Sequence, residues 1–309
     1  MPSFPSNPRQ DPAIRSILAD WPDLPYRNLR VAPLHVLAEL SARAMASDNV
    51  FIDPSGLGAA AWCPLPWDSE NFGVSMARLD LLWTRDEDPA RLGGLLDQVL
   101  QDLRARGVQH VAYRTDLARI VTIRLLEARG FRLVDGLQML CCRPRAPQPG
   151  LAVRDYRPSD RDALLAVAGA GFQRTHTRYG SDPNLDPERA AETYVRWTDN
   201  CLAGRRGDWV GVRVLDGEPA GFITCLLHRV QEAPDPVTVG VIDLIAVNAR
   251  FQGRGVGVEL VRAAQNWLGP RSALLTTGTR CDNAQAIAMF TKTGYRIRSS
   301  KVGMHAWLG

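Results

Sequence analysis

The segment Gln252–Gly257 (Gln-Gly-Arg-Gly-Val-Gly) has the glycine spacing and the position of an anion-binding loop, between a strand-like run and a helix-like run. Glycines at 255 and 257 let backbone N–H groups approach a ligand without interference from a Cβ, and the following helix N-terminus adds roughly half a positive charge. A pyrophosphate group fits such a cradle. The segment lacks the Gly-Lys-Ser/Thr of a Walker loop, and Val258 occupies the last glycine position of a dinucleotide-binding motif. The alternative is a glycine-rich turn that holds no ligand.

The runs around this loop predict the order βααβββαβαβ for residues 151–309. Asp186 as N-cap with Pro187 at the first helical position begins one helix, and Ser159 with Asp162 resembles a capping box for another. The first three strands after these helices read as an antiparallel meander. Expected strands cover 151–156, 209–215, 220–230, 237–247, 273–279 and, as closing strands, 295–308; expected helices cover 159–170, 186–204, the run from the loop to residue 268, and 283–293.

Part of this order is repeated in the first half, with strands expected at 76–84 and 108–115, helices at 89–106 and 117–129, and a further strand after them. Gly130-Phe131 matches Gly294-Tyr295 after the last helix, which indicates a duplication. The segment 85–91, which enters the first helix of this half, is acidic and lacks the glycine pattern, so we expect no polyanion there. The proline-rich stretch 143–150 reads as a linker, which gives domains 1–150 and 151–309.

Composition limits the classes of function. With 45% hydrophobic and 23% charged residues the chain is globular, and it has no apolar run of about 20 residues and no secretory signal, so we expect a cytoplasmic protein without membrane contact. The net charge of +4 is too small for a nucleic-acid partner. Because residues 151–309 carry 20 basic and 16 acidic side chains, a small polyanionic ligand is expected there. Six cysteines without a CxxC pair predict reduced thiols and no metal, and two lysines argue against Schiff-base chemistry.

At this point residues 151–309 resemble the GNAT superfamily of N-acetyltransferases. That family has a Gln/Arg-x-x-Gly-x-Gly/Ala motif after its fourth strand, followed later by an asparagine and a Tyr-x-x-x-Gly-Phe element. The matching positions are Gln252, Gly255 and Gly257, then Asn283-x-x-Ala286 and Phe290-x-x-x-Gly294-Tyr295. The resemblance implies an α/β (α+β) fold with a mixed, mostly antiparallel sheet flanked by helices, built as tandem halves of which the first is degenerate.

The resemblance also implies acetyl-coenzyme A as donor, lying along the fourth strand between parted strands. The pantetheine and thioester would lie beside Ile245, Ala246 and Val247, whose backbone N–H groups are candidates for the oxyanion contact. Asn283 would bond the cofactor, and the face of Phe290 would lie near its sulfur. The pyrophosphate would rest on the loop residues Gln252, Gly253, Arg254, Gly255, Val256 and Gly257.

Catalytic residues are harder to assign. The family's proposed general acid is a tyrosine at the position of Phe290, so we expect slower turnover, with water, Thr291 or Tyr295 as weak proton donors. A thiolate with a pKa near 8 to 9 is a fair leaving group without such an acid. Asp243, the only carboxylate in the fourth strand, is the candidate base. A hydrogen-bonded aspartate on the solvent face is the alternative.

Two segments, 65–73 (Leu-Pro-Trp-Asp-Ser-Glu-Asn-Phe-Gly) and 177–183, resemble the TDP-fucosamine acetyltransferases, which acetylate a nucleotide-linked amino sugar. Arg178 could pair with an acceptor phosphate, and Tyr179 could stack on a base or sugar; Trp67 and Trp197 could stack as well, or anchor the core. We therefore expect transfer to a primary amine of a small molecule, by direct attack, in a monomer or homodimer. Another amine (aminoglycoside, polyamine or peptide N-terminus) and a non-catalytic coenzyme A-binding module remain alternatives.

Overall fold

The computed structural model describes residues 49–173, 177–230 and 237–309, and these form two compact units. The described part of the first unit runs to Val134 and adds Lys301–Gly309, whereas the second contains Asp135–Arg229 and Val237–Ser300. Each unit has its own buried core. No described helix combines the length and apolar character that crossing a membrane requires.

The second unit is a mixed sheet in the order β5-β10-β9-β8-β7-β6, and it shows the predicted order of elements. Only β9 and β10 pair in parallel among the registers described for this unit; β5 with β10, β6 with β7, and β7 with β8 are antiparallel. The elements are β5 (Arg132–Cys142), β6 (Val153–Asp155), α6 (Arg161–Gln173), α7 (Pro187–Leu202), β7 (Trp209–Leu215), β8 (Glu218–Val230), β9 (Val237–Val247), α8 (Val256–Leu268), β10 (Leu274–Arg280), α9 (Ala284–Lys292) and β11 (Arg296–Trp307).

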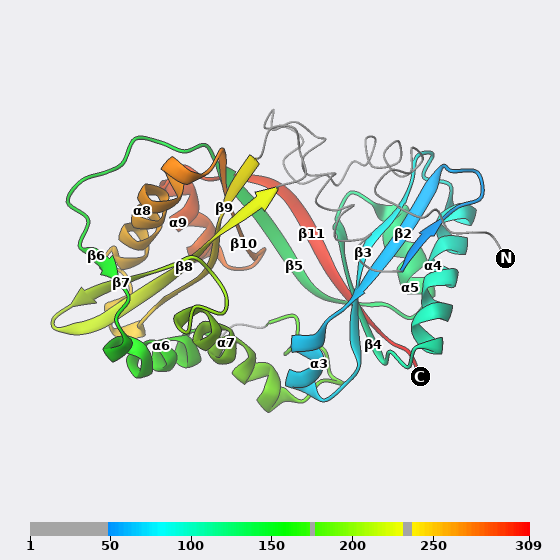
Figure 1. Cartoon of the computed structure of the whole chain (residues 1–309), viewed down its shortest axis with the longest axis horizontal. Helices are drawn as coiled ribbons and strands as arrows, with labels where there is room; N and C mark the ends of the chain where they lie inside the picture. Colours follow the sequence, from blue (N-terminus) through cyan, green and yellow to red (C-terminus); the bar gives the residue numbers. More distant parts are fainter. Residues whose placement is uncertain (1–48, 174–176, 231–236) are drawn as a thin grey trace. The chain divides into compact units, whose positions relative to one another are not determined.

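Helices cover both faces of this sheet (Figure 1). One core joins α8 and α9 to the sheet through residues such as Leu260, Ile223 and Phe290. The other joins α6 and α7 to the opposite face through residues such as Leu164 and Phe222. The neighbouring residues 222 and 223 of β8 thus pack in different cores, because successive side chains of a strand point to opposite faces of the sheet.

The alternation reverses within β9. Ile242 belongs to the α8 and α9 core, yet Leu244 and Ala246 belong to the α6 and α7 core, although two-residue steps keep one face in a regular strand. The Leu244 N–H donates to the Thr224 side-chain hydroxyl at 3.0 Å, rather than only to strand carbonyls. We interpret this reversal as a β-bulge at Asp243, a feature that redirects side chains and often lies beside functional sites.

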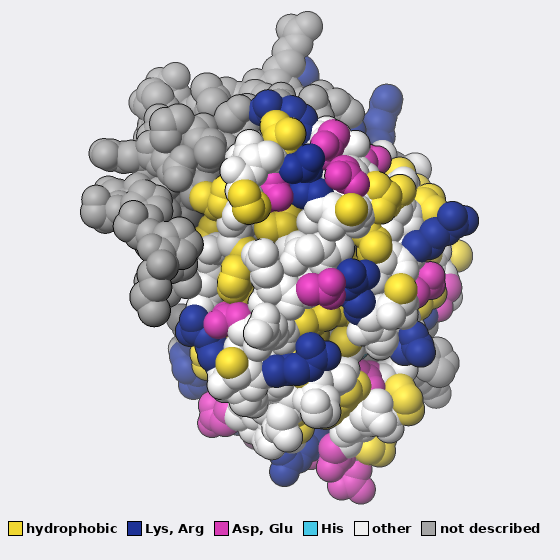
Figure 2. Space-filling view, turned by 90° about the vertical axis from the view of Figure 1, so that its right-hand side faces the viewer, with side chains coloured by type: hydrophobic (Ala, Val, Ile, Leu, Met, Phe, Trp, Pro, Cys, Tyr) yellow, Lys and Arg dark blue, Asp and Glu magenta, His cyan; other side chains and the backbone are white. Residues whose placement is uncertain are grey.

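The first unit contains β1 (Val50–Ile52), β2 (Gly58–Pro64), α3 (Pro66–Phe72), β3 (Met76–Thr84), α4 (Pro89–Ala105), β4 (His110–Asp116) and α5 (Ile120–Ala128). Its strand order is β1-β2-β3-β4-β11, with β3 and β4 parallel. Figure 2 shows basic and acidic side chains interspersed, rather than gathered by sign, on the face seen there. Ion pairs on α4 agree with this picture, including Arg91 with Asp53 at 2.8 Å and Arg129 with Asp97 at 2.6 Å.

The closing strands of the two halves are exchanged. β5 ends the first half in sequence, but its residues 137–142 pair with β10. β11 ends the second half, but its residues 301–307 pair with β4. The compact units therefore divide after Val134 and again within β11, whereas the expected linker 143–150 lies wholly in the second unit.

Two local expectations differ from the structure. The capping interaction before α6 is made by Asp160, whose carboxylate accepts from the Arg157 N–H at 2.9 Å, and a 3₁₀ turn at Pro158–Asp160 precedes the helix. The run 295–308 forms the single strand β11 rather than several strands.

Candidate active site

The parallel pairing of β9 and β10 stops partway along both strands. The register runs from Val239 opposite Leu274 to Ile242 opposite Thr277 and ends there, although β9 continues to Val247 and β10 to Arg280. The strands therefore part beside the bulge, as expected for a strand edge that is open to an extended ligand. Ile245 and Val247 are half-buried and Ala246 is 7% exposed, next to this opening.

The loop after β9 presents unpaired backbone donors. Buried Phe251 and Val256 anchor it on either side, while positions 252–255 are exposed. Gly255, the N-cap of α8, has φ +82°, a left-handed conformation that favours glycine. Within the described residues, no hydrogen-bond acceptor is found for the N–H groups of residues 255–258. Four consecutive free donors at a helix N-terminus form an anion cradle.

Close helix packing explains the next glycine. A Cβ at Gly257 would lie 2.6 Å from the Met289 sulfur, so glycine lets α8 approach α9. The Arg254 guanidinium is already paired with Asp216 at 2.9 Å, so this residue offers its backbone rather than a free charge. The exposed Gln252 completes the loop.

Asn283 and Phe290 lie on the neighbouring helix. The Asn283 Oδ1 accepts from the Ala286 N–H at 3.0 Å and caps α9, which leaves the Nδ2 donors for a ligand. Phe290 is 2% exposed and packs edge-to-face on Tyr295, with 5.4 Å between ring centroids. Burial and the nearby Cys142 thiol raise the pKa of Tyr295 well above its ordinary value, which makes its hydroxyl a weak proton donor.

Asp243 is held by two partners. Arg206 donates to both of its oxygens, at 2.8 and 3.1 Å, and the Trp197 Nε1–H donates to Oδ2 at 2.9 Å. The guanidinium also lies over the Trp197 ring at 4.5 Å. Burial lowers the pKa of Arg206, but the hydrogen bond and charge of Asp243 raise it more, so the guanidinium stays charged. Both oxygens already accept hydrogen bonds, which suits a positioning role, and the expected role of Asp243 as proton acceptor stays a prediction.

The two candidate acceptor contacts lie in one turn. Arg178 donates to the Tyr179 hydroxyl and covers its ring at 4.5 Å, and Tyr179 is 3% exposed. Arg206 could not be inferred from the sequence, because its link to Asp243 spans 37 residues of chain.

The order of the elements and the loop after β9 are those of a GNAT-type domain, and the comparisons agree. Residues 173–295 match the model of the Acetyltransferase (GNAT) family. This part of the chain is therefore a GNAT acetyltransferase domain.

Similar sequences have related descriptions. The spore coat polysaccharide biosynthesis protein SpsD of Bacillus subtilis is 29% identical over 49% of both chains, and the mycothiol acetyltransferase of Tsukamurella paurometabola is 33% identical over 49% of this chain and 50% of that protein. The chain thus spans about half the length of these two relatives. The dTDP-fucosamine acetyltransferase of Escherichia coli O6:H1 is 26% identical over 77% of this chain and 94% of that protein. Two of these three relatives are described as acetyltransferases.

Solved structures confirm the tandem fold. A GCN5-related N-acetyltransferase from Sphaerobacter thermophilus has a TM-score of 0.59 at 16% identity, covering 99% of this chain and 97% of that one. A tandem GNAT protein from the clavulanic acid biosynthesis pathway has a TM-score of 0.56 at 14% identity, covering 99% and 98%. The predicted fold class, a mixed and mostly antiparallel sheet in tandem GNAT-like halves, is therefore confirmed.

Proposed function

We propose that the chain transfers an acetyl group from acetyl-coenzyme A to a primary amine on a nucleotide-linked amino sugar. The four free N–H groups at residues 255–258 carry the donor half of this proposal, since a pyrophosphate is the group that such a cradle suits. The cradle directly follows the strand that parts from β10. A donor bound along β9 would therefore be held at both its phosphate end and its pantetheine arm.

The residues of the chain have limited tasks in this reaction. Backbone N–H groups of Ala246 and Val247 are proposed to stabilise the oxyanion that develops on the thioester carbonyl. The neutral amine attacks that carbonyl carbon and forms the carbon–nitrogen bond while the carbon–sulfur bond breaks. The nitrogen releases a proton to water, and the departing thiolate takes up a proton from water. The Asp243 and Arg206 pair is proposed to fix the bulge beside the reacting groups rather than to move the proton.

The acceptor half rests on different support. The dTDP-fucosamine acetyltransferase aligns over nearly its whole length, which includes both halves of this chain. Arg178 is a cation suited to an acceptor phosphate, whereas Tyr179 is 3% exposed under the Arg178 guanidinium and is proposed to hold that side chain rather than to stack on a sugar. The mycothiol acetyltransferase relatives favour a second candidate, a different small amine.

The test is release of coenzyme A from acetyl-coenzyme A in the presence of dTDP-linked 4-amino sugars, other amino sugars, polyamines and peptide N-termini. We expect turnover with the nucleotide-linked amines and an acetylated product by mass spectrometry. Turnover only with other amines would refute the acceptor. Binding of acetyl-coenzyme A without any product would refute the transferase and favour a coenzyme A-binding module.

A further inference from the structure

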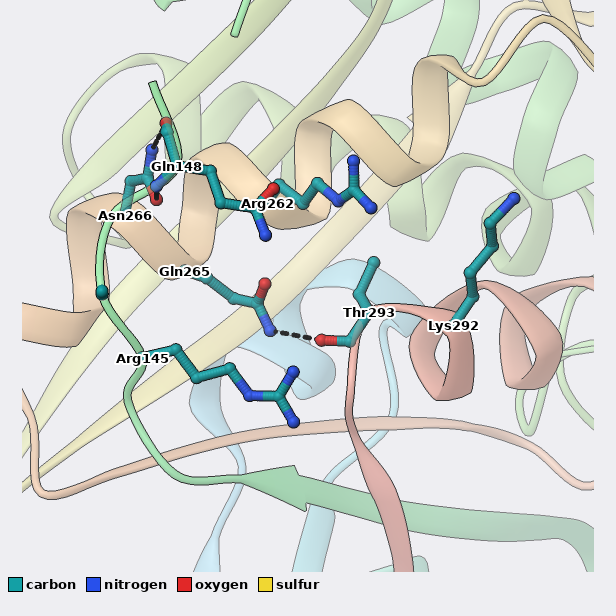
Figure 3. Close-up of a pocket in the computed structure, with 8 residues that line it drawn as sticks. Arg145, Gln148, Arg262, Gln265, Asn266, Lys292 and Thr293 are labelled. Carbon is teal, nitrogen blue, oxygen red and sulfur yellow. Dashed lines mark hydrogen bonds between the residues drawn. The ribbon is translucent and has the colours of Figure 1, made fainter. Parts of the chain in front are cut away.

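A polar pocket lies in the second unit, beside the part of α8 that is distant from the cradle (Figure 3). Its volume is about 120 Å³, and its lining comes from three segments: Arg145 from the stretch after β5, Arg262 and Gln265 from α8, and Lys292 and Thr293 from the end of α9. This lining contains three cations and no carboxylate.

The three cations differ from most other basic residues of the described chain in their pairing. Within the described residues, no carboxylate pairs with Arg145, Arg262 or Lys292. By contrast, Arg213 reaches Glu259 on the same helix at 2.5 Å. Three uncompensated positive charges around a small pocket repel one another, and a bound anion would relieve that repulsion.

The frame of the pocket is fixed by hydrogen bonds. Asn266 of α8 clamps the stretch after β5, since its Oδ1 accepts from the Gln148 N–H at 2.9 Å and its Nδ2 donates to the Gln148 carbonyl at 2.7 Å. Gln265 donates to the Thr293 carbonyl at 2.9 Å, which joins α8 to the end of α9. The stretch predicted as a linker is therefore one wall of a built pocket.

The Arg145 guanidinium packs against the backbone at Gly294. Gly294 has φ +93°, and a Cβ at this position would lie 2.6 Å from atoms of the Arg145 guanidinium. Glycine is thus required here both by its conformation and by the approach of the arginine. Arg262 of α8 and Lys292 at the end of α9 line the same pocket and supply its two other positive charges.

The pocket is separate from the donor cradle. Gln265 lies ten residues after Gly255, which at 1.5 Å per residue places it about 15 Å along the helix from the cradle. A volume of about 120 Å³ holds one tetrahedral oxyanion and is too small for a nucleotide. We propose that this pocket binds the phosphate group of a small phosphorylated molecule, at a site distinct from that of acetyl-coenzyme A.

The test uses the full chain with inorganic phosphate and methyl phosphate as probes, in calorimetry and thermal melting against potassium chloride at equal ionic strength. We expect saturable binding of both and a Tm higher by a few degrees at phosphate concentrations about tenfold above Kd. The triple variant Arg145→Ala, Arg262→Ala, Lys292→Ala should weaken binding at least tenfold.

A charge-matched triple variant provides the control, with alanine at three exposed arginines outside the pocket, Arg124, Arg143 and Arg296; it should bind phosphate as the wild type does. The single variants Arg145→Ala and Lys292→Ala, at exposed positions, serve if the triple variant unfolds. Equal effects of phosphate and chloride, or equal losses in both triple variants, would overturn the proposal. The proposal would also be overturned if only the pocket triple variant changed its preference for coenzyme A over dephospho-coenzyme A. In that case the pocket would bind the phosphate of coenzyme A that dephospho-coenzyme A lacks. Binding of inorganic phosphate but not methyl phosphate would overturn the monoester ligand. None of these readouts depends on acetyl transfer.

Discussion

The Asp243 and Arg206 pair can be measured directly by a double-mutant cycle with Asp243→Asn and Arg206→Met. The two substitutions keep the side-chain lengths and remove the charges. Their non-additive effect on the free energy of unfolding is the interaction energy of the pair.

Burial sets the expected magnitude of this energy. The Asp243 side chain is 9% exposed and the Arg206 side chain 46%. Exposed pairs are worth up to about 1 kcal/mol, whereas breaking a fully buried pair costs about 3 to 5 kcal/mol. A half-buried pair with two hydrogen bonds should therefore give about 2 kcal/mol. The Arg250 and Glu218 pair, whose side chains are 70% and 52% exposed, provides the control and should give less than about 1 kcal/mol.

The assay is urea unfolding followed by circular dichroism and by tryptophan fluorescence, with free energies compared only where both probes coincide. Once an acceptor is known, the pH dependence of kcat/KM adds a second readout. A positioning residue leaves the acidic limb of that profile in place in Asp243→Asn. Additive stability effects, together with loss of the acidic limb, would refute our interpretation and restore Asp243 as the base.

Three further predictions concern single positions. Gly255→Ala and Gly217→Ala place alanine at φ +82° and +81° with no atom near the new Cβ, so both variants should lose about 1 to 2 kcal/mol of stability. Calorimetry should show weakened acetyl-coenzyme A binding only for Gly255→Ala. Equal losses of binding in the two variants would count against the cradle. Phe290→Tyr should speed coenzyme A release by at least tenfold if a general acid is missing, with Phe290→Leu as the control without a hydroxyl, and an unchanged rate would remove that idea. Burial raises the pKa of Cys201 from 9.0 to about 11, so this thiol stays protonated at pH 8. Iodoacetamide should therefore alkylate the exposed Cys281 before Cys201, as followed by peptide mass spectrometry. Equal alkylation rates of the two thiols would contradict the burial of Cys201. Since the folded thiol keeps a proton that the unfolded one loses, the same shift makes stability fall as pH rises above about 9.

The sequence predicted the elements well where the signals are local. Alternating runs placed β7 and β9 at their observed bounds, and Asp186 with Pro187 located the start of α7. The glycine spacing also predicted a tight turn before α8, because glycine permits the positive φ found at Gly255, and the binding role of this turn stays a prediction. In such cases the physical cause lies within a few residues of its effect.

What remained hidden depends on contacts that are distant in sequence. The partners of Asp243 are 37 and 46 residues away, so its pairing could not be inferred from β9 alone. Likewise, Arg145 and Lys292 share a pocket although they lie in different parts of the chain. The division after Val134 follows from the pairing of β5 with β10, which no local composition signals, whereas proline content pointed to residues 143–150.

Because each half contributes its last strand to the other half, no single division of the chain yields two fragments with complete sheets. A fragment that begins at residue 151 would lack β5, which pairs with β10. The edge of β10 would then expose unpaired amide and carbonyl groups, which promote aggregation. Engineering that transfers one half to another protein must therefore include the closing strand that the other half supplies. The two halves depend on each other, although each is encoded as one continuous segment.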